Sequence, residues 1–209
     1  MSLTNLTDQA SGAARCPCGS GLSRERCCDL DWTAAWPDPD GADLELLRRM
    51  QPGADPAAAG PFLVELLEKS PTNVTALLLL NELRAGSSPA AAEALLGRIV
   101  RIDPNHLAAT QALALRLFQR GALIPAEHHA RNAVRIAPTD AQSHNLMGMI
   151  MTEAQRPQVG EHHYRRAHEL LGAPSPILLA NLAWNLKNQG RMEESRQLTF
   201  STSGAGLQL

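Results

Sequence analysis

The segment VRIDPN at residues 100–105 returns as VRIAPT at residues 134–139, 34 residues further along the chain. In both copies a proline follows an apolar, helix-forming stretch, and Pro71 and Pro174 extend the series in both directions. Because proline cannot continue a helix, prolines at a nearly fixed spacing mark helix ends at a nearly fixed spacing. The sequence therefore predicts an array of similar helical units.

A period of 34 residues is that of the tetratricopeptide repeat (TPR), in which each unit is a helix–turn–helix. The chain resembles this family at its small-residue positions, which are Ala114, Gly121, Ala126, Ala133, Gly148 and Ala167. Gly160 stands where the family usually has Ala. Small side chains at these positions let paired helices approach closely. We expect an all-α fold, a right-handed superhelical TPR solenoid of antiparallel helix pairs.

The composition agrees with this expectation and excludes several functions. Hydrophobic residues make up 44% of the chain and aromatic residues only 3%, which suits close helix packing better than a β-sandwich. A formal charge of -2 gives no electrostatic reason to bind nucleic acid or an anionic membrane. The first residues lack the apolar core of a signal peptide, and no stretch is long enough to span a bilayer, so we expect a cytoplasmic protein.

The four cysteines lie together near the N-terminus, at Cys16, Cys18, Cys27 and Cys28. Adjacent cysteines beside a Cys-x-Cys pair cannot close useful disulfide loops, whereas four thiolates form a complete tetrahedral shell for Zn²⁺. Such a shell leaves no open position for a catalytic water, so the expected zinc site is structural. A redox-labile cluster, or a motif kept without metal, is the alternative interpretation.

The run CPCGSGLSRERCC at residues 16–28 resembles the SEC-C motif, the zinc-binding tail of the SecA preprotein translocase motor. The resemblance covers this run alone, including its CxCGSG core. It implies that the four cysteines are the zinc ligands and that the module is a docking element. We expect such a module to release zinc on mutation of Cys27 and Cys28 without disturbing the repeats.

The order of these features predicts five parts of the chain. They are a disordered N-terminus (1–14), the SEC-C-like zinc motif (15–30), a linker with a degenerate helix (31–61), the TPR array (62–200) and a disordered tail (201–209). Within the array we expect full repeats at about 73–106, 107–140 and 141–175, and an incomplete repeat at 176–200. The linker is rich in Asp, Pro, Ala and Gly, which is typical of a hinge. Its Trp32 and Trp36 are expected to pack on the chain's own fold, with partner contact as the alternative.

In TPR arrays the first helices of the repeats line a groove that binds peptides. The groove positions of the family pattern predict the partner-binding residues Asn81, Arg84, Gln111, Gln119, Asn145, Thr152, Trp184, Lys187 and Asn188. Amides pair with the backbone of an extended peptide, and Arg84 or Lys187 suits a carboxylate. The array resembles the carboxylate-clamp class only loosely, because Leu77 stands where a clamp has a cation. The alternative is that these side chains simply solvate a helical face.

Two histidine pairs, His128–His129 and His162–His163, occupy the same places in successive repeats. Neighbouring residues point about 100° apart on a helix, so one pair cannot hold one metal. Solvated surface histidines are the favoured interpretation, and a cross-repeat metal or pH-sensitive cluster is the alternative.

These features together favour a non-enzymatic scaffold that binds a protein or peptide partner in its groove. The alternative rests on the phrase NLAWNLKNQGRMEES, which is similar to the N-terminal arrays of bacterial TPR sulfotransferases, whose catalytic domain binds PAPS. On that interpretation the chain is the regulatory or substrate-recruiting portion of a sulfotransferase, separated from its catalytic domain. The incomplete last repeat is expected to be covered by a partner or by a second copy of the chain, or to continue into a longer protein.

Overall fold

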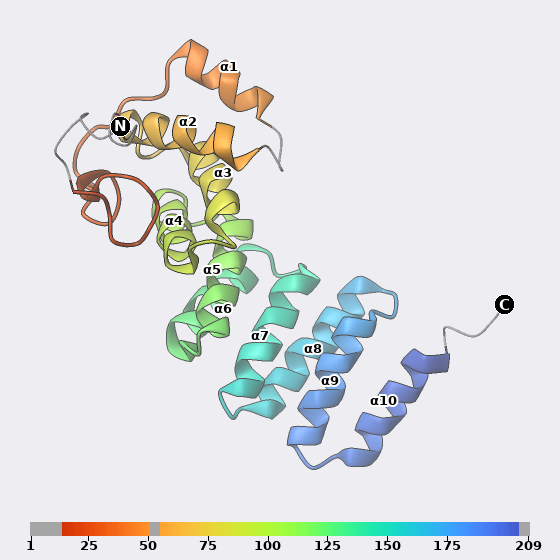
Figure 1. Cartoon of the computed structure of the whole chain (residues 1–209). Helices are drawn as coiled ribbons and strands as arrows, with labels where there is room; N and C mark the ends of the chain where they lie inside the picture. Colours follow the sequence, from red (N-terminus) through yellow and green to blue (C-terminus); the bar gives the residue numbers. More distant parts are fainter. Residues whose placement is uncertain (1–13, 51–54, 205–209) are drawn as a thin grey trace, which may run out of the picture. The chain divides into compact units, whose positions relative to one another are not determined.

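The computed structural model describes residues 14–50 and 55–204, so the predicted N-terminal segment and residues 205–209 of the predicted tail lie almost wholly outside it. Within the described residues the chain forms ten α-helices and one short 3-10 helix, η1 at Arg24–Arg26, and no β-strand longer than an isolated bridge (Figure 1). The chain divides into two compact units, Met1–Pro104 and Asn105–Leu209. The predicted all-α fold is confirmed.

The first unit contains the cysteine-rich loop and four helices. The helices are α1 (Gly41–Arg49), α2 (Pro56–Lys69), α3 (Val74–Arg84) and α4 (Pro89–Ile102). Side chains cap the N-termini of α3 and α4: Asn73 accepts a hydrogen bond from the Ala76 N–H, and Ser88 accepts one from the Ala91 N–H. Residues 31–61, assigned from the sequence to a linker with a degenerate helix, thus contain α1 and the first six residues of α2.

The second unit contains three antiparallel helix pairs. They are α5 (Leu107–Gln119) with α6 (Leu123–Ile136), α7 (Ala141–Glu153) with α8 (Pro157–Leu171), and α9 (Pro176–Asn188) with α10 (Met192–Gly204). We call α5, α7 and α9 the A helices and their partners the B helices. The helix α10 continues through residues 201–204, which the sequence assigned to the tail, and Leu198 packs against the core of the last pair.

Gly148 and Gly160 show why the pair of α7 and α8 needs glycine. A Cβ at Gly148 would lie 2.7 Å from the ring of Tyr164, which fills the space between the helices. A Cβ at Gly160 would lie 2.7 Å from Thr152 Oγ1 and 2.9 Å from the Gly148 carbonyl oxygen. All three distances are shorter than the contacts that real Cβ atoms make, so even Ala does not fit at Gly160 unless its neighbours move. The close approach predicted from small residues is confirmed here.

Candidate functional site

The four cysteine thiols converge on one point in the first unit. Their sulfur atoms all lie within 4.8 Å of one another. The shortest separations are 3.2 Å between Cys16 and Cys28 and 3.5 Å between Cys18 and Cys27. Sulfurs at the corners of a zinc tetrahedron with bonds of about 2.3 Å would lie roughly 3.8 Å apart. The cluster therefore has the dimensions of a four-thiolate metal site.

Backbone hydrogen bonds fold the loop around this point. The Cys16 N–H donates to the Leu22 carbonyl at 2.8 Å, and an antiparallel bridge joins Arg15 to Ser23. Between them Gly19 and Gly21 have φ of +87° and +88°, a backbone conformation that side chains with a Cβ rarely adopt. The short η1 helix then places Cys27 and Cys28 opposite the first two thiols.

The protonation of the metal-free thiols is uneven. Burial raises the pKa of Cys16, but hydrogen bonds from the Cys18 backbone and the Cys28 thiol outweigh it and lower that pKa to about 7. Burial raises the pKa of Cys27 and also that of Cys28, to about 12. Because burial disfavours the thiolates of Cys27 and Cys28, a site of four thiolates requires the charge of a bound cation.

A buried arginine of α4 accompanies the thiols. Arg98 is only 5% exposed; its Nη2 donates to the Pro71 carbonyl, while its Nε and Nη1 have no partner with full hydrogen-bond geometry among the described residues, the Cys27 thiol being the nearest candidate acceptor. Burial lowers the pKa of Arg98, and the nearby thiols of Cys27, Cys28 and Cys18 oppose that shift. A buried cation with unpaired donors needs an anion, and a Zn²⁺ with four thiolates carries a net charge of about −2. The residues present therefore fit zinc.

The cysteine loop is attached to the helices of its own unit. Glu68 of α2 accepts hydrogen bonds from the backbone N–H and the hydroxyl of Ser23, at 2.5 and 2.7 Å. Ser88 at the start of α4 donates to the Cys18 carbonyl at 3.1 Å, and Trp32 stacks under the guanidinium of Arg101 at 4.2 Å. The loop thus packs on α2 and α4 of its own unit, and its role as a docking element stays a prediction. These contacts also place Trp32 within the chain's own fold, as the sequence favoured.

The predicted groove residues divide into two groups. Gln111 and Thr152 are buried and bonded within the chain: Gln111 donates to Asp140 and Ser143, and Thr152 donates to the Gly148 carbonyl and accepts from Asn185. These two side chains join neighbouring helices rather than face a ligand. The exposed or half-buried predicted residues are Asn81, Arg84, Gln119, Asn145, Trp184, Lys187 and Asn188.

An apolar row, of which the sequence interpretation named only Trp184, runs along the A helices. Leu115, Met149 and Trp184 hold the ninth position of three successive repeats, and Leu115 and Trp184 are 37% and 56% exposed. Ile177, at the second position of α9, is 74% exposed. We call Leu115, Met149, Ile177 and Trp184 the A-helix row. The positional rule that gave Trp184 also points to Leu115, Met149 and Ile177, which the sequence interpretation did not name.

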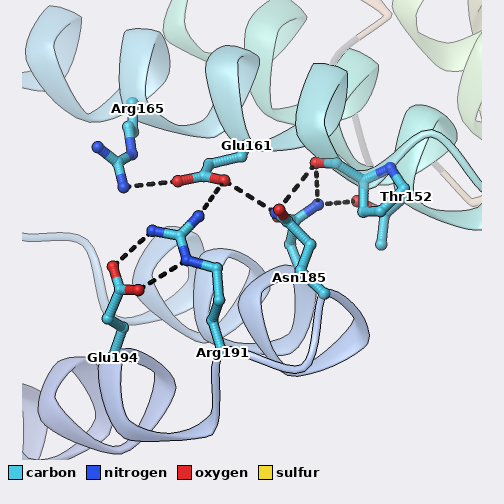
Figure 2. A network of polar contacts seen from close by, with 8 residues as sticks. Thr152, Glu161, Arg165, Asn185, Arg191 and Glu194 are labelled. Carbon is cyan, nitrogen blue, oxygen red and sulfur yellow. Dashed lines mark hydrogen bonds and ion pairs between the residues drawn. The ribbon is translucent and has the colours of Figure 1, made fainter.

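Carboxylates of the B helices form a repeated polar network (Figure 2). Glu161 of α8 is bonded to Arg191 at the start of α10 at 2.6 Å, to Arg165 one turn further along α8 at 2.5 Å, and to Gln189. Glu127, 34 residues earlier, binds Arg131 and Arg156 in the same way. Burial raises the pKa of Glu161, but Gln189 and Arg191 outweigh it, so the pKa falls below its usual value. Each carboxylate therefore joins one B helix to the start of the next.

The histidine pairs are only partly solvated. His128 and His162 are exposed as favoured from the sequence, but His163 is half-buried and its Nδ1 lies 3.0 Å from Nδ1 of His144. His144 Nε2 lies 3.1 Å from the Pro138 carbonyl oxygen, so it donates there and leaves Nδ1 to accept from His163. Burial, and the charges of His144 and His162, lower the pKa of His163 to about 4. His163 is thus a neutral packing residue.

Comparison with solved structures identifies the fold. The fragment of MamA from residue 41 to its end, from Desulfovibrio magneticus RS-1, superposes with a TM-score of 0.70 at 16% identity, covering 81% of this chain and 96% of that one. The thermophilic TPR protein TTC0263 of Thermus thermophilus superposes with a TM-score of 0.54 at 20% identity, covering 75% and 84%. The chain therefore has the fold of a TPR solenoid. No protein-family model and no curated protein matches it, so the SEC-C and sulfotransferase resemblances rest on the residues alone.

Among the residues that the structure describes, no helix combines the length and the apolar character that crossing a membrane requires.

Proposed function

We propose that this chain is a non-enzymatic scaffold that binds a segment of a partner polypeptide on the A-helix row, and that its four cysteines hold a structural Zn²⁺. The observation that carries the first part is the exposure of Leu115, Ile177 and Trp184; the fourth member of the row, Met149, packs partly against the core of the last pair. Large apolar side chains such as Ile177 and Trp184 are usually buried, and an aligned set of them on one surface is typical of a protein-binding site.

Polar groups beside the row suit an extended peptide. The Asn145 side chain accepts a hydrogen bond from Asn181 at 3.0 Å, and among the described residues its amide N–H groups meet only the weak acceptor Met149 Sδ at 3.9 Å. They are therefore available to a peptide carbonyl. Lys187 Nζ lies 5.6 Å from the centre of the Trp184 ring, which places a positive charge at the end of the row. We expect a partner segment with apolar anchors and an acidic residue near Lys187.

Site-directed photo-crosslinking in the native cell tests this proposal. A photoreactive amino acid at position 184 should give a discrete adduct with a partner polypeptide. The matched control is position 124, because Ile124 is 86% exposed but lies on the B helix α6. The adduct from position 184 should also disappear with Leu115→Ala. Equal labelling from positions 184 and 124 would contradict binding on the A-helix row.

The zinc proposal rests on the sulfur geometry and on the unpaired donors of Arg98. Zinc here would supply no reaction chemistry, because four thiolates complete its shell. Its role would be to hold Cys16 and Cys18 to Cys27 and Cys28, and so to fix the loop on α2 and α4. Elemental analysis of protein purified without chelator should give about one zinc per chain. Negligible zinc with four freely alkylated thiols would overturn it.

A further inference from the structure

A cavity in the first unit lies outside both proposed sites. Its volume is about 540 Å³, within the range of roughly 300–1,000 Å³ that small ligands occupy. It lies between the cysteine loop, α2 and α3, and its wall is formed by Arg15, Gly21, Ala57, Gly60, Pro61, Val64, Leu83 and Arg84. The cavity is therefore built from elements of one compact unit.

Two guanidinium groups meet in this cavity at Gly21. Arg15 Nη1 donates to the Gly21 carbonyl at 2.5 Å. Arg84 Nη2 lies 3.2 Å from the position that a Cβ of Gly21 would occupy, so its guanidinium rests directly on that glycine. The φ of +88° at Gly21 favours glycine, and this keeps the space between the two cations open.

The positive charges have no acidic partner in the cavity. Of the residues that form its wall, none is Asp or Glu, and the two acidic residues of α2 are engaged with Lys69 and Ser23. Arg84 Nε is buried and has no hydrogen-bond partner in the part of the chain that the structure describes. Two cations close together with an unpaired buried donor form an environment that favours an anion.

The rest of the wall is apolar. Ala57, Pro61, Val64 and Leu83 supply only hydrocarbon, and no hydroxyl or amide side chain lines the cavity. A sugar phosphate or nucleotide would leave its hydroxyl groups without partners there. A guanidinium pair with apolar walls instead matches a planar carboxylate attached to a compact apolar group.

We propose that this cavity binds a carboxylate with an apolar body, held by Arg15 and Arg84. Two sources offer that chemistry: the C-terminal residue of a polypeptide, and a free organic acid. The site does not involve the A-helix row or the cysteine thiols, so the inference stands or falls separately from the proposed function.

NMR titration of the ¹⁵N-labelled full chain loaded with zinc tests the site. The probes are hexanoate, the tripeptide N-acetyl-Ala-Ala-Leu with a free carboxylate, and the same tripeptide as its C-terminal amide. The backbone amides of Gly21, Gly60 and Leu83 should shift saturably with a free carboxylate and not with the amide. If the tripeptide acid binds at least about tenfold more tightly than hexanoate, the ligand is a polypeptide C-terminus. If hexanoate binds as tightly or more tightly, the ligand is a free organic acid.

Variants separate binding from folding. Arg84→Met should weaken carboxylate binding at least about tenfold, and Ala57→Trp, which fills the cavity from its rim, should abolish it. Arg49→Met is the control, because Arg49 lies on α1 paired with Glu45. Each variant should keep the zinc content and melting temperature of the parent. The proposal is overturned if neither carboxylate shifts these amides at about 10 mM, if the tripeptide amide binds as well, or if only inorganic phosphate binds.

Discussion

Arg98 and Cys27 line the same cavity of about 230 Å³, and the thiol of Cys27 opposes the effect of burial on the arginine more than any other group does. One residue belongs to the cysteine loop and the other to α4, 71 residues later in the chain. This relationship joins the cysteine cluster to the packing of α4. It suggests that zinc and helix packing depend on each other.

Replacing Arg98 tests that dependence directly. Arg98→Met keeps much of the side-chain volume and removes the charge, so we expect zinc affinity to fall by about 10- to 100-fold, as for other groups that support metal ligands. Without zinc the same variant should be at least as stable as the parent, because an uncompensated buried cation is gone. Competition with a chelator and thermal melting measure the two effects. Arg166→Met, which changes an exposed cation of the second unit, should leave zinc affinity nearly unchanged.

Zinc removal should disturb one part of the chain selectively. We expect chelation, or Cys27→Ser with Cys28→Ser, to increase amide hydrogen exchange in α2 and α4, where Glu68 and Ser88 hold the loop. The exchange of α7 and α9 should stay as it was, because those helices belong to the other compact unit. Unchanged exchange in α2 and α4 would restore the interpretation of the loop as a separate module.

The carboxylate of Glu161 should stabilise the second unit. Its side chain is only 13% exposed and binds two arginines, so Glu161→Gln should lower the free energy of unfolding by about 1–3 kcal/mol. Glu169→Gln is the control, since that carboxylate is 63% exposed and pairs only with Arg166. Its effect should stay below about 1 kcal/mol. Urea unfolding followed by circular dichroism measures both variants.

Two glycine substitutions should have opposite signs. Gly160→Ala places a methyl group against Thr152 and a backbone carbonyl, so we expect destabilisation by about 1–3 kcal/mol. At Gly97, within α4, nothing lies within 4 Å of an added Cβ, and Gly97→Ala should stabilise by about 0.5–1 kcal/mol. Thermal melts of the two variants are sufficient. Stabilisation by Gly160→Ala would show that the pair of α7 and α8 is less tightly packed than described, and destabilisation by Gly97→Ala would contradict the open space around Gly97.

Acid should weaken the fold in two separate pH ranges. Burial lowers the pKa of His163 to about 4 from 6.5, so the unfolded chain binds more protons between these values and stability falls as the pH drops through them. The pKa values of Glu127 and Glu161 are also lowered, but from 4.5, so their contribution is lost only at lower pH. His163→Gln should make the stability depend less on pH between about pH 6.5 and 4.5. The control His162→Gln, which changes the exposed neighbouring histidine, should leave this pH dependence as it was. Urea midpoints across this range check the expectation.

The groove residues show where the sequence interpretation was incomplete. Of the residues predicted from their repeat positions, Trp184 is exposed and Asn145 is half-buried, whereas Gln111 and Thr152 are buried between helices. A repeat position sets the direction of a side chain on its helix. It does not decide whether a neighbouring helix carries a partner for that side chain, as Asp140 does for Gln111 and Asn185 does for Thr152.

The sequence by itself determined the helical repeat, through its 34-residue period and its prolines, and it placed the four cysteines of the proposed metal site in one short run. Both are local properties, because a turn, a helix end or a Cys-x-Cys pair depends on residues close in the chain. Only the tertiary structure decided that the cysteine loop packs on α2 and α4, that Arg98 faces its thiols, and that Arg15 and Arg84 share a cavity. These contacts join residues tens of positions apart, and their energy comes from burial and charge pairing that no local pattern records.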